Sequence, residues 1–196
     1  MTDQNPKSVL QPVDAEARRL AKTLLRKARF AALAVLDPST GSPSVSRVNV
    51  ATTMDGRLVF LISSLSPHFA SLDADPRASL LVGEPGKGDP LAHPRMTLIG
   101  RAGRTPRQDI QESIRRRFLA KHPKSELYVD FADFAFWTLE PERISLNGGF
   151  GKAFEMQPGD LLTETDGLAD LIAIEAGAVE HMNADHTDAI DNYARA

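Results

Sequence analysis

The sequence predicts a mainly β fold with helices, of the α+β class: a small antiparallel barrel with flanking helices and a short helical unit towards the C-terminal end. Two observations carry this prediction. Short apolar segments follow one another with turn residues between them, which is typical of strands that pair with their sequence neighbours. Amphipathic segments with capping residues interrupt these strands, which indicates flanking helices.

The helices are predicted from their start signals. Asp14 is placed to cap the first helix, and Ser66-Pro67 suits the N-cap and first position of a short second one. Thr105-Pro106-Arg-Gln108 has the pattern of a capping box before a third. The predicted helices therefore cover 14–29, a short stretch after Ser66, the residues after Thr105, and 168–195.

The strands are predicted from short apolar runs between turn residues. Asp55-Gly56 is a strong hairpin signal between the second and third strands. A polar link is expected over 155–166. The predicted strands are 31–36, 45–51, 58–62, 78–82, 96–102, 134–139 and 143–146.

These elements predict a chain in three parts. Residues 1–13 are expected to be a disordered N-terminal tail. Residues 14–154 are expected to form the barrel domain. Residues 155–196 are expected to be a linker and the start of a small helical unit.

Composition excludes several function classes. The net charge of −3 gives no basic surface for nucleic acid. The chain has no cysteine, so it has no disulfide, thiolate nucleophile or cysteine-ligated cluster, which fits a reducing cytoplasm. No apolar run reaches the roughly 18 residues needed to cross a bilayer, and the polar start is not a signal peptide. We therefore expect a cytoplasmic protein without nucleic acid or membrane partners.

One strand and the turn after the next strand carry the groups most suited to an anion. Arg47 lies in a strand beside the apolar Val48 and Val50, so it either extends along a barrel rim or binds an anion. Ser63, Ser64 and Ser66 follow the next strand, and a helix N-terminus at Ser66 would present N–H groups to a phosphate. His68 in the first turn could donate to the same anion.

The order of these residues resembles the flavin mononucleotide (FMN) site of the pyridoxamine 5'-phosphate oxidase-like split barrels, over roughly residues 25–150. The resemblance rests on Ser44-Val-Ser-Arg47-Val-Asn-Val-Ala-Thr52, the Asp55-Gly56 turn and Ser63-Ser-Leu-Ser66. It implies that Arg47 and the groups after the third strand hold the FMN phosphate, and that backbone groups near Asn49 meet the flavin ring. The implied cofactor-binding residues are Arg47, Val48, Asn49, Val50, Ala51, Ser63, Ser64, Ser66 and His68.

A second resemblance concerns residues 175–190. The segment Glu175-Ala-Gly-Ala-Val-Glu-His181-Met-Asn-Ala-Asp185-His186 is similar to the opening of the helical unit in a subgroup of this family. That subgroup includes haem-utilisation proteins of the HugZ type, which degrade haem. The resemblance therefore implies haem as an alternative ligand.

The two histidines of this segment are not expected to form a metal site. They are five residues apart, which places them about 140° apart around a straight helix. Their rings are therefore expected to point in different directions, and no metal ligand is assigned.

Three functions remain open from the sequence. The preferred hypothesis is a homodimeric FMN-binding oxidoreductase of unassigned substrate, in which the flavin supplies the redox chemistry. The first alternative is a haem-binding or haem-degrading protein. The second is a non-enzymatic module that binds a partner through a degenerate flavin pocket. No catalytic residue is assigned.

Overall fold

The computed structural model describes residues 10–105 and 112–195. The chain divides into two units, Met1–Thr163 and Glu164–Ala196, and each is described by itself. No helix among the described residues is long and apolar enough to cross a membrane. Residues 1–9 of the predicted tail and residues 106–111 of the predicted capping box and third helix lie outside the described residues.

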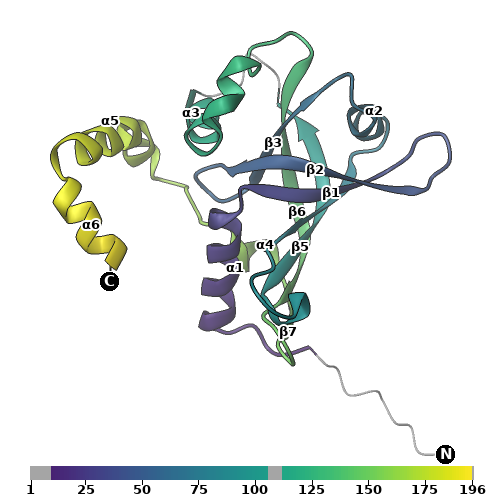
Figure 1. Ribbon diagram of the computed structural model, residues 1–196, viewed down its shortest axis with the longest axis horizontal. Helices are drawn as coiled ribbons and strands as arrows, with labels where there is room; N and C mark the ends of the chain where they lie inside the picture. Colours follow the sequence, from purple (N-terminus) through teal and green to yellow (C-terminus); the bar gives the residue numbers. More distant parts are fainter. Residues whose placement is uncertain (1–9, 106–111, 196) are drawn as a thin grey trace, which may run out of the picture. The chain divides into compact units, whose positions relative to one another are not determined.

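The first unit is an antiparallel β-barrel (Figure 1). Its sheet order is β3-β2-β1-β4-β5-β6-β7, and an additional pairing between β3 and β6 closes six strands into the barrel. The predicted antiparallel barrel is thus confirmed. The strands are β1 (Phe30–Leu36), β2 (Pro43–Thr52), β3 (Leu58–Ser63), β4 (Arg77–Val82), β5 (Arg95–Arg104), β6 (Phe134–Asn147) and β7 (Ala153–Met156).

Strand β3 is apolar on both faces because both faces are covered. Leu58, Phe60 and Ile62 belong to the main core. Val59 and Leu61 belong to a second cluster with Phe118 of α3 (Glu112–Lys121). Since successive side chains of a strand point to opposite faces, double coverage requires an unbroken apolar run.

Strand β6 replaces the two strands predicted at 134–139 and 143–146. It is continuous over 14 residues, and its register against β5 shifts between Ile99 and Gly100. Gly100 pairs with Pro141 there, and a Cβ on Gly100 would lie 2.0 Å from the Glu140 carbonyl oxygen. Proline has no N–H to donate to the ladder, and it is tolerated here because a bulge leaves a residue unpaired. The two predicted strands are therefore one strand that continues through the bulge.

The helices of the first unit flank the barrel. The Asp14 side chain caps α1, as predicted, by accepting the Ala17 N–H at 2.8 Å. Two elements were missed because they are too short for a periodic signal: β7, which runs into the predicted 155–166 link, and α4, which lies within it. The helices are α1 (Ala15–Lys27), α2 (Pro67–Ala74), α3 and α4 (Pro158–Leu161), with 3₁₀ turns at η1 (Pro90–Ala92) and η3 (Pro123–Leu127).

The second unit contains two helices, α5 (Ala169–Asp185) and α6 (Thr187–Arg195), instead of one continuous helix. The break lies at His186, the C-cap of α5, whose φ of −131° and ψ of 38° leave the helical region. None of the described residues from 164 to 195 is buried. These helices therefore have no apolar core of their own.

Candidate ligand-binding face of the barrel

The predicted site residues of β2 alternate between the two faces of the strand. Arg47 and Asn49 are exposed on the outer face. Val48 and Val50 are buried in the main core. Ala51 is buried in the second cluster beneath α3. The side chains of Arg47 and Asn49 can therefore meet a ligand outside the barrel, whereas the other three are buried in the two clusters.

Arg47 stacks on an aromatic ring of the neighbouring strand. Its guanidinium carbon lies 5.0 Å from the centre of the Phe30 ring. Among the described residues no carboxylate forms an ion pair with Arg47. The sequence left open whether Arg47 follows a rim or binds an anion, and this position is compatible with both. A cation–π contact holds the guanidinium in place while its N–H groups remain available.

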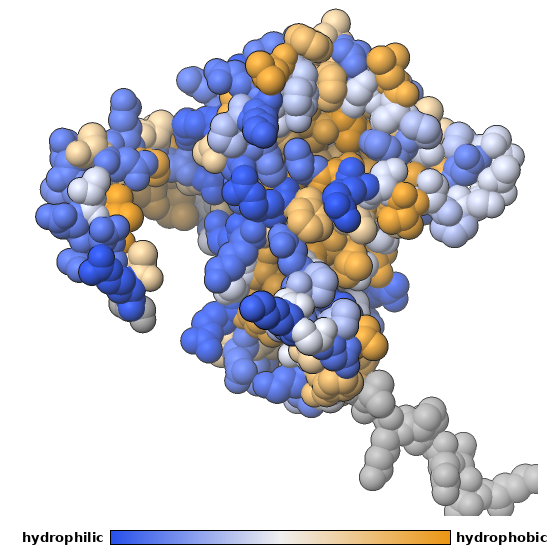
Figure 2. Space-filling model, viewed as in Figure 1, coloured by the Kyte–Doolittle hydropathy of each residue, from blue (hydrophilic) through white to orange (hydrophobic). Residues whose placement is uncertain are grey.

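The outer face beside Arg47 carries mostly small and apolar side chains. Cross-strand partners share a face of the sheet, so the strand register places two rows of side chains next to each other. Val45 is 66% exposed and Leu81 41% exposed. Figure 2 shows apolar surface among charged surface across the barrel. The rows are Arg47–Ala32–Leu81–Thr97 and Val45–Ala34–Ser79–Ile99.

A shallow groove of about 320 Å³ crosses this face between Ala34, Ser79 and Ile99. Arg77 at its edge is paired with Asp75, with Nη2 2.5 Å from Oδ2. The hydrogen bonds from Arg77 lower the pKa of the Asp75 carboxyl to about 2. Arg77 is thus occupied by a carboxylate, unlike Arg47.

The serine turn after β3 is built around a carboxylate. Ser63 Oγ donates to Asp133 Oδ2 at 2.6 Å, and the Ser64 N–H donates to the Asp133 carbonyl oxygen at 2.7 Å. Ser66 stands at the N-cap of α2 but does not cap it: its hydroxyl donates to the Ser63 carbonyl oxygen at 2.7 Å. The expected side-chain cap is therefore wrong. The Asp133 carboxylate also places a negative charge where the phosphate was predicted, and like charges repel.

Arg47 and the serine turn are not joined by any contact between described residues. The ladder between β2 and β3 pairs Val50 with Phe60 and Thr52 with Leu58, and Arg47 lies beyond its end. The structure therefore groups the three serines with Asp133 and places Arg47 with Phe30. Asp133 was missed because it follows η3, far from the serines in sequence.

His68 is the histidine of the first unit best placed to act as a ligand. It is half-buried in the first turn of α2, which packs against β1. Burial lowers its pKa, so the ring is neutral near pH 7. His93 and His122 instead bond to the carbonyl oxygens of Lys87 and Val50, at 3.0 and 2.9 Å.

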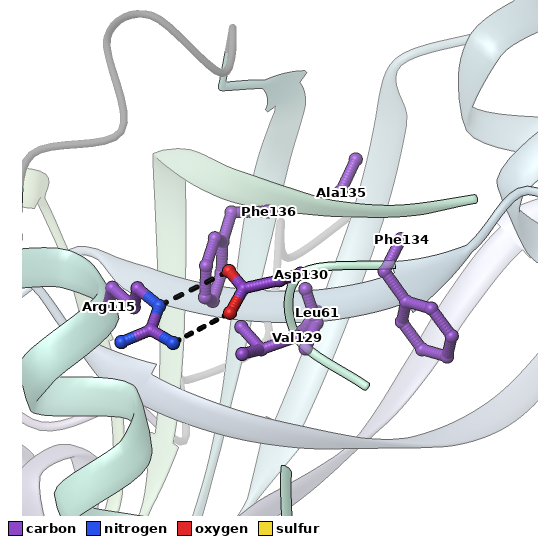
Figure 3. Close-up of a pocket in the computed structure, with 7 residues that line it drawn as sticks. All are labelled: Leu61, Arg115, Val129, Asp130, Phe134, Ala135 and Phe136. Atoms are coloured by element: carbon purple, nitrogen blue, oxygen red, sulfur yellow. Dashed lines mark hydrogen bonds and ion pairs between the residues drawn. The ribbon is translucent and has the colours of Figure 1, made fainter. Parts of the chain in front are cut away.

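A second pocket of about 230 Å³ lies between α3, η3 and β6 (Figure 3). Leu61, Val129 and Phe136 line its apolar side, and Arg115 pairs with Asp130 across it at 2.8 Å. The three arginines at 115–117 are half-buried. Arg117 Nε, for example, donates to the Thr52 carbonyl oxygen at 3.0 Å. Arg117 therefore attaches α3 to β2, and Arg115 attaches it to the segment after η3.

Comparison with known families agrees with this architecture. A family profile described as "CREG, beta-barrel" matches residues 12–161, which span the whole barrel. The chain belongs to the CREG β-barrel family. The split-barrel assignment made from the sequence is thereby confirmed.

Relatives of this CREG β-barrel protein come from plants and bacteria. It is 38% identical over 152 residues to the chloroplastic non-canonical heme oxygenase HOZ of Arabidopsis thaliana, and the match covers 76% of this chain but only 46% of HOZ. It is 33% identical to the Agrobacterium tumefaciens protein Atu2129, of unknown function, with a TM-score of 0.80 and coverage of 91% and 74%. It is 30% identical to a heme binding protein from Mycobacterium smegmatis, with a TM-score of 0.69 and coverage of 89% and 71%.

Proposed function

We propose that this CREG β-barrel protein binds haem and that it does so as a homodimer. The observation that carries the proposal is its similarity to two haem-related proteins, one of them over 89% of this chain. The chain spans less than half of HOZ, so haem degradation by this chain is a separate proposal that needs its own test. Haem is preferred here to the FMN oxidoreductase that the sequence favoured.

The outer face of the barrel has the chemistry that haem requires. A porphyrin is flat and apolar and carries two carboxylates at one edge. The rows centred on Ala32 and Ala34 combine small and apolar side chains beside a shallow groove. Arg47 at the end of one row is exposed and forms no ion pair among the described residues, so it can bind a carboxylate through a charge-assisted hydrogen bond.

The FMN phosphate fits the serine turn less well. The Ser63 and Ser66 hydroxyl protons are already donated within the turn, and the Asp133 carboxylate opposes a second anion. FMN would therefore gain no hydroxyl donor from Ser63 or Ser66 for its phosphate. The flavin hypothesis is kept as the competing one.

His68 is the proposed ligand to the haem iron. Its lowered pKa keeps an imidazole lone pair available at neutral pH, which is the form that ligates metals. The other two histidines of the first unit are engaged with backbone carbonyls.

The test is a titration of the purified full chain with haem and, in parallel, with FMN. The expected result is a saturable Soret band with one haem per chain and weaker binding of FMN. Tight FMN binding without a Soret band would support the flavin hypothesis and overturn this one. Supplying an electron donor and dioxygen to the haem complex then tests degradation, which would appear as loss of the Soret band with formation of an open-chain tetrapyrrole.

A further inference from the structure

His181 and His186 lie against each other in the second unit. Their Nε2 atoms are joined by a hydrogen bond of 3.1 Å, and their rings meet edge to face with centroids 4.8 Å apart. The straight-helix expectation that these rings diverge is wrong. The reason is the helix break, since α5 ends at Asp185 and His186 leaves helical geometry, which turns its ring back towards His181.

Asp185 fixes the orientation of the first ring. Its Oδ2 lies 2.9 Å from His181 Nδ1. A neutral imidazole that donates its Nδ1–H to a carboxylate has its lone pair on Nε2. A carboxylate behind a histidine is also the usual outer partner of a metal-bound imidazole, because it sets the tautomer and makes the ring a better donor.

The separation of the two Nε2 atoms matches that of two ligands on one metal ion. Two imidazole nitrogens bound at about 2.05 Å, with an angle of 90–110° at the ion, lie roughly 2.9–3.4 Å apart. The two axial ligands of a haem iron lie on opposite faces of the porphyrin, roughly 4 Å apart. The pair therefore fits a free ion with adjacent ligands and not a haem held from both faces.

We propose that His181 and His186 bind a divalent transition-metal ion through their Nε2 atoms, with Asp185 as the positioning residue of His181. Two imidazoles favour Zn²⁺, Ni²⁺ or Cu²⁺ over the oxygen-preferring Mg²⁺ and Ca²⁺. No cluster of three or more metal-ligating side chains occurs in the described part of the chain, so water or an added ligand completes the coordination. Both side chains are exposed, so an ion can reach them from solvent.

The experiment titrates the haem-free full chain with Zn²⁺ by calorimetry and with Cu²⁺ by electron paramagnetic resonance. The expected results are one ion per chain and a Cu²⁺ spectrum with two nitrogen ligands. His181→Gln and His186→Gln should each abolish the binding, while His93→Gln, a histidine of the first unit, should leave it unchanged. Asp185→Asn should weaken it by about ten- to a hundredfold.

Two outcomes would overturn the proposal. If the heat of Zn²⁺ binding to wild type does not exceed that of the double glutamine variant, the two imidazoles form a hydrogen bond with each other and bind no metal ion. If the double variant also loses haem binding at unchanged helical circular dichroism, the pair serves the haem iron. Retained haem binding in a variant that has lost Zn²⁺ binding supports a separate site, and this result is independent of whether the proposed haem function holds.

Discussion

Lys121 and Arg29 join the C-terminal ends of α3 and α1 through two reciprocal hydrogen bonds to backbone carbonyl oxygens. Lys121 Nζ donates to the carbonyl oxygen of Ala28, the C-cap of α1, at 2.7 Å. Arg29, the residue after that cap, donates through Nη2 to the carbonyl oxygen of Lys121, the last residue of α3. Cations at helix C-termini satisfy free carbonyls and oppose the negative end of the helix dipole.

This arrangement crowds positive charge around Lys121 and predicts an unusual titration. Burial, and then Arg29, Arg117 and Arg26, lower the pKa of Lys121 from 10.5 to about 8. Below about pH 8 the Lys121 amine is protonated in both the folded and the unfolded state. The folded state then carries the full free-energy cost of holding this charge half-buried beside three arginines. Between pH 8 and 10.5 the folded state binds fewer protons, so stability rises with pH.

The measurement compares the free energy of unfolding of wild type and Lys121→Met across pH 7 to 10. The variant also loses the hydrogen bond to Ala28, which lowers its stability by the same amount at every pH. The difference in unfolding free energy between wild type and variant should therefore still increase in favour of the wild type as pH rises. Side-chain NMR of the lysine amines should show one titration near pH 8 that disappears in the variant. A flat stability difference would contradict the lowered pKa.

The haem proposal predicts a specific loss on Arg47→Ala. A hydrogen bond to a charged group is worth about 1.5–3 kcal/mol, so haem affinity should fall by about ten- to a hundredfold. Arg47→Lys should recover part of the loss, since lysine keeps the charge without the planar fork. Arg19→Ala, on an exposed position of α1, should leave haem affinity unchanged.

The ligand control for Arg47 is haem dimethyl ester, which lacks free carboxylates. Its affinity should fall much less than that of haem in Arg47→Ala. Equal losses for the two ligands would mean that Arg47 acts only through its contact with Phe30. FMN and riboflavin provide the same comparison for the flavin hypothesis.

His68→Ala should change the haem spectrum from that of an imidazole-ligated iron, and added imidazole should restore it. His93→Ala serves as the matched variant and should keep the wild-type spectrum, because its ring is engaged with Lys87. A wild-type spectrum in His68→Ala would remove this residue from the iron.

Asp133→Asn separates the flavin and haem hypotheses. Removing a like charge a few ångströms from a phosphate is worth about 1 kcal/mol, which is about fivefold in affinity. FMN affinity should rise by that factor if the phosphate occupies the serine turn, while riboflavin and haem affinities stay constant. No change for FMN would place the phosphate elsewhere.

The outer face of β1 and β4, which we also assign to haem, predicts dimerisation through this face with haem between the two copies. Ala34→Arg should disrupt the dimer, because it places a long cation within the row of small side chains. Ala120→Arg, on an exposed position of α3, is the matched control and should remain dimeric. Analytical ultracentrifugation of wild type and both variants at micromolar concentration measures the oligomeric state. A wild-type monomer in the presence of haem would contradict the prediction.

The sequence determined the local elements of this protein, because each depends on a few neighbouring residues. Asp14 caps α1, Asp55 and Gly56 lie in the turn between β2 and β3, and the double-sided apolar run of β3 marks a strand covered on both faces. Side-chain alternation and turn chemistry follow from backbone geometry, which adjacent residues already specify. The split-barrel family could be identified from this order of elements.

Only the tertiary structure decided which groups meet. Ser63 and Asp133 are 70 residues apart, and Lys121 and Ala28 are 93 apart, so their contacts depend on barrel closure and on how α3 packs. His181 and His186 are close in sequence, yet their contact depends on where α5 ends, which the periodicity of the segment did not reveal. These contacts depend on strand register and on where a helix ends. Both are decided by the packing free energy of the whole fold, which overrides the preferences of neighbouring residues.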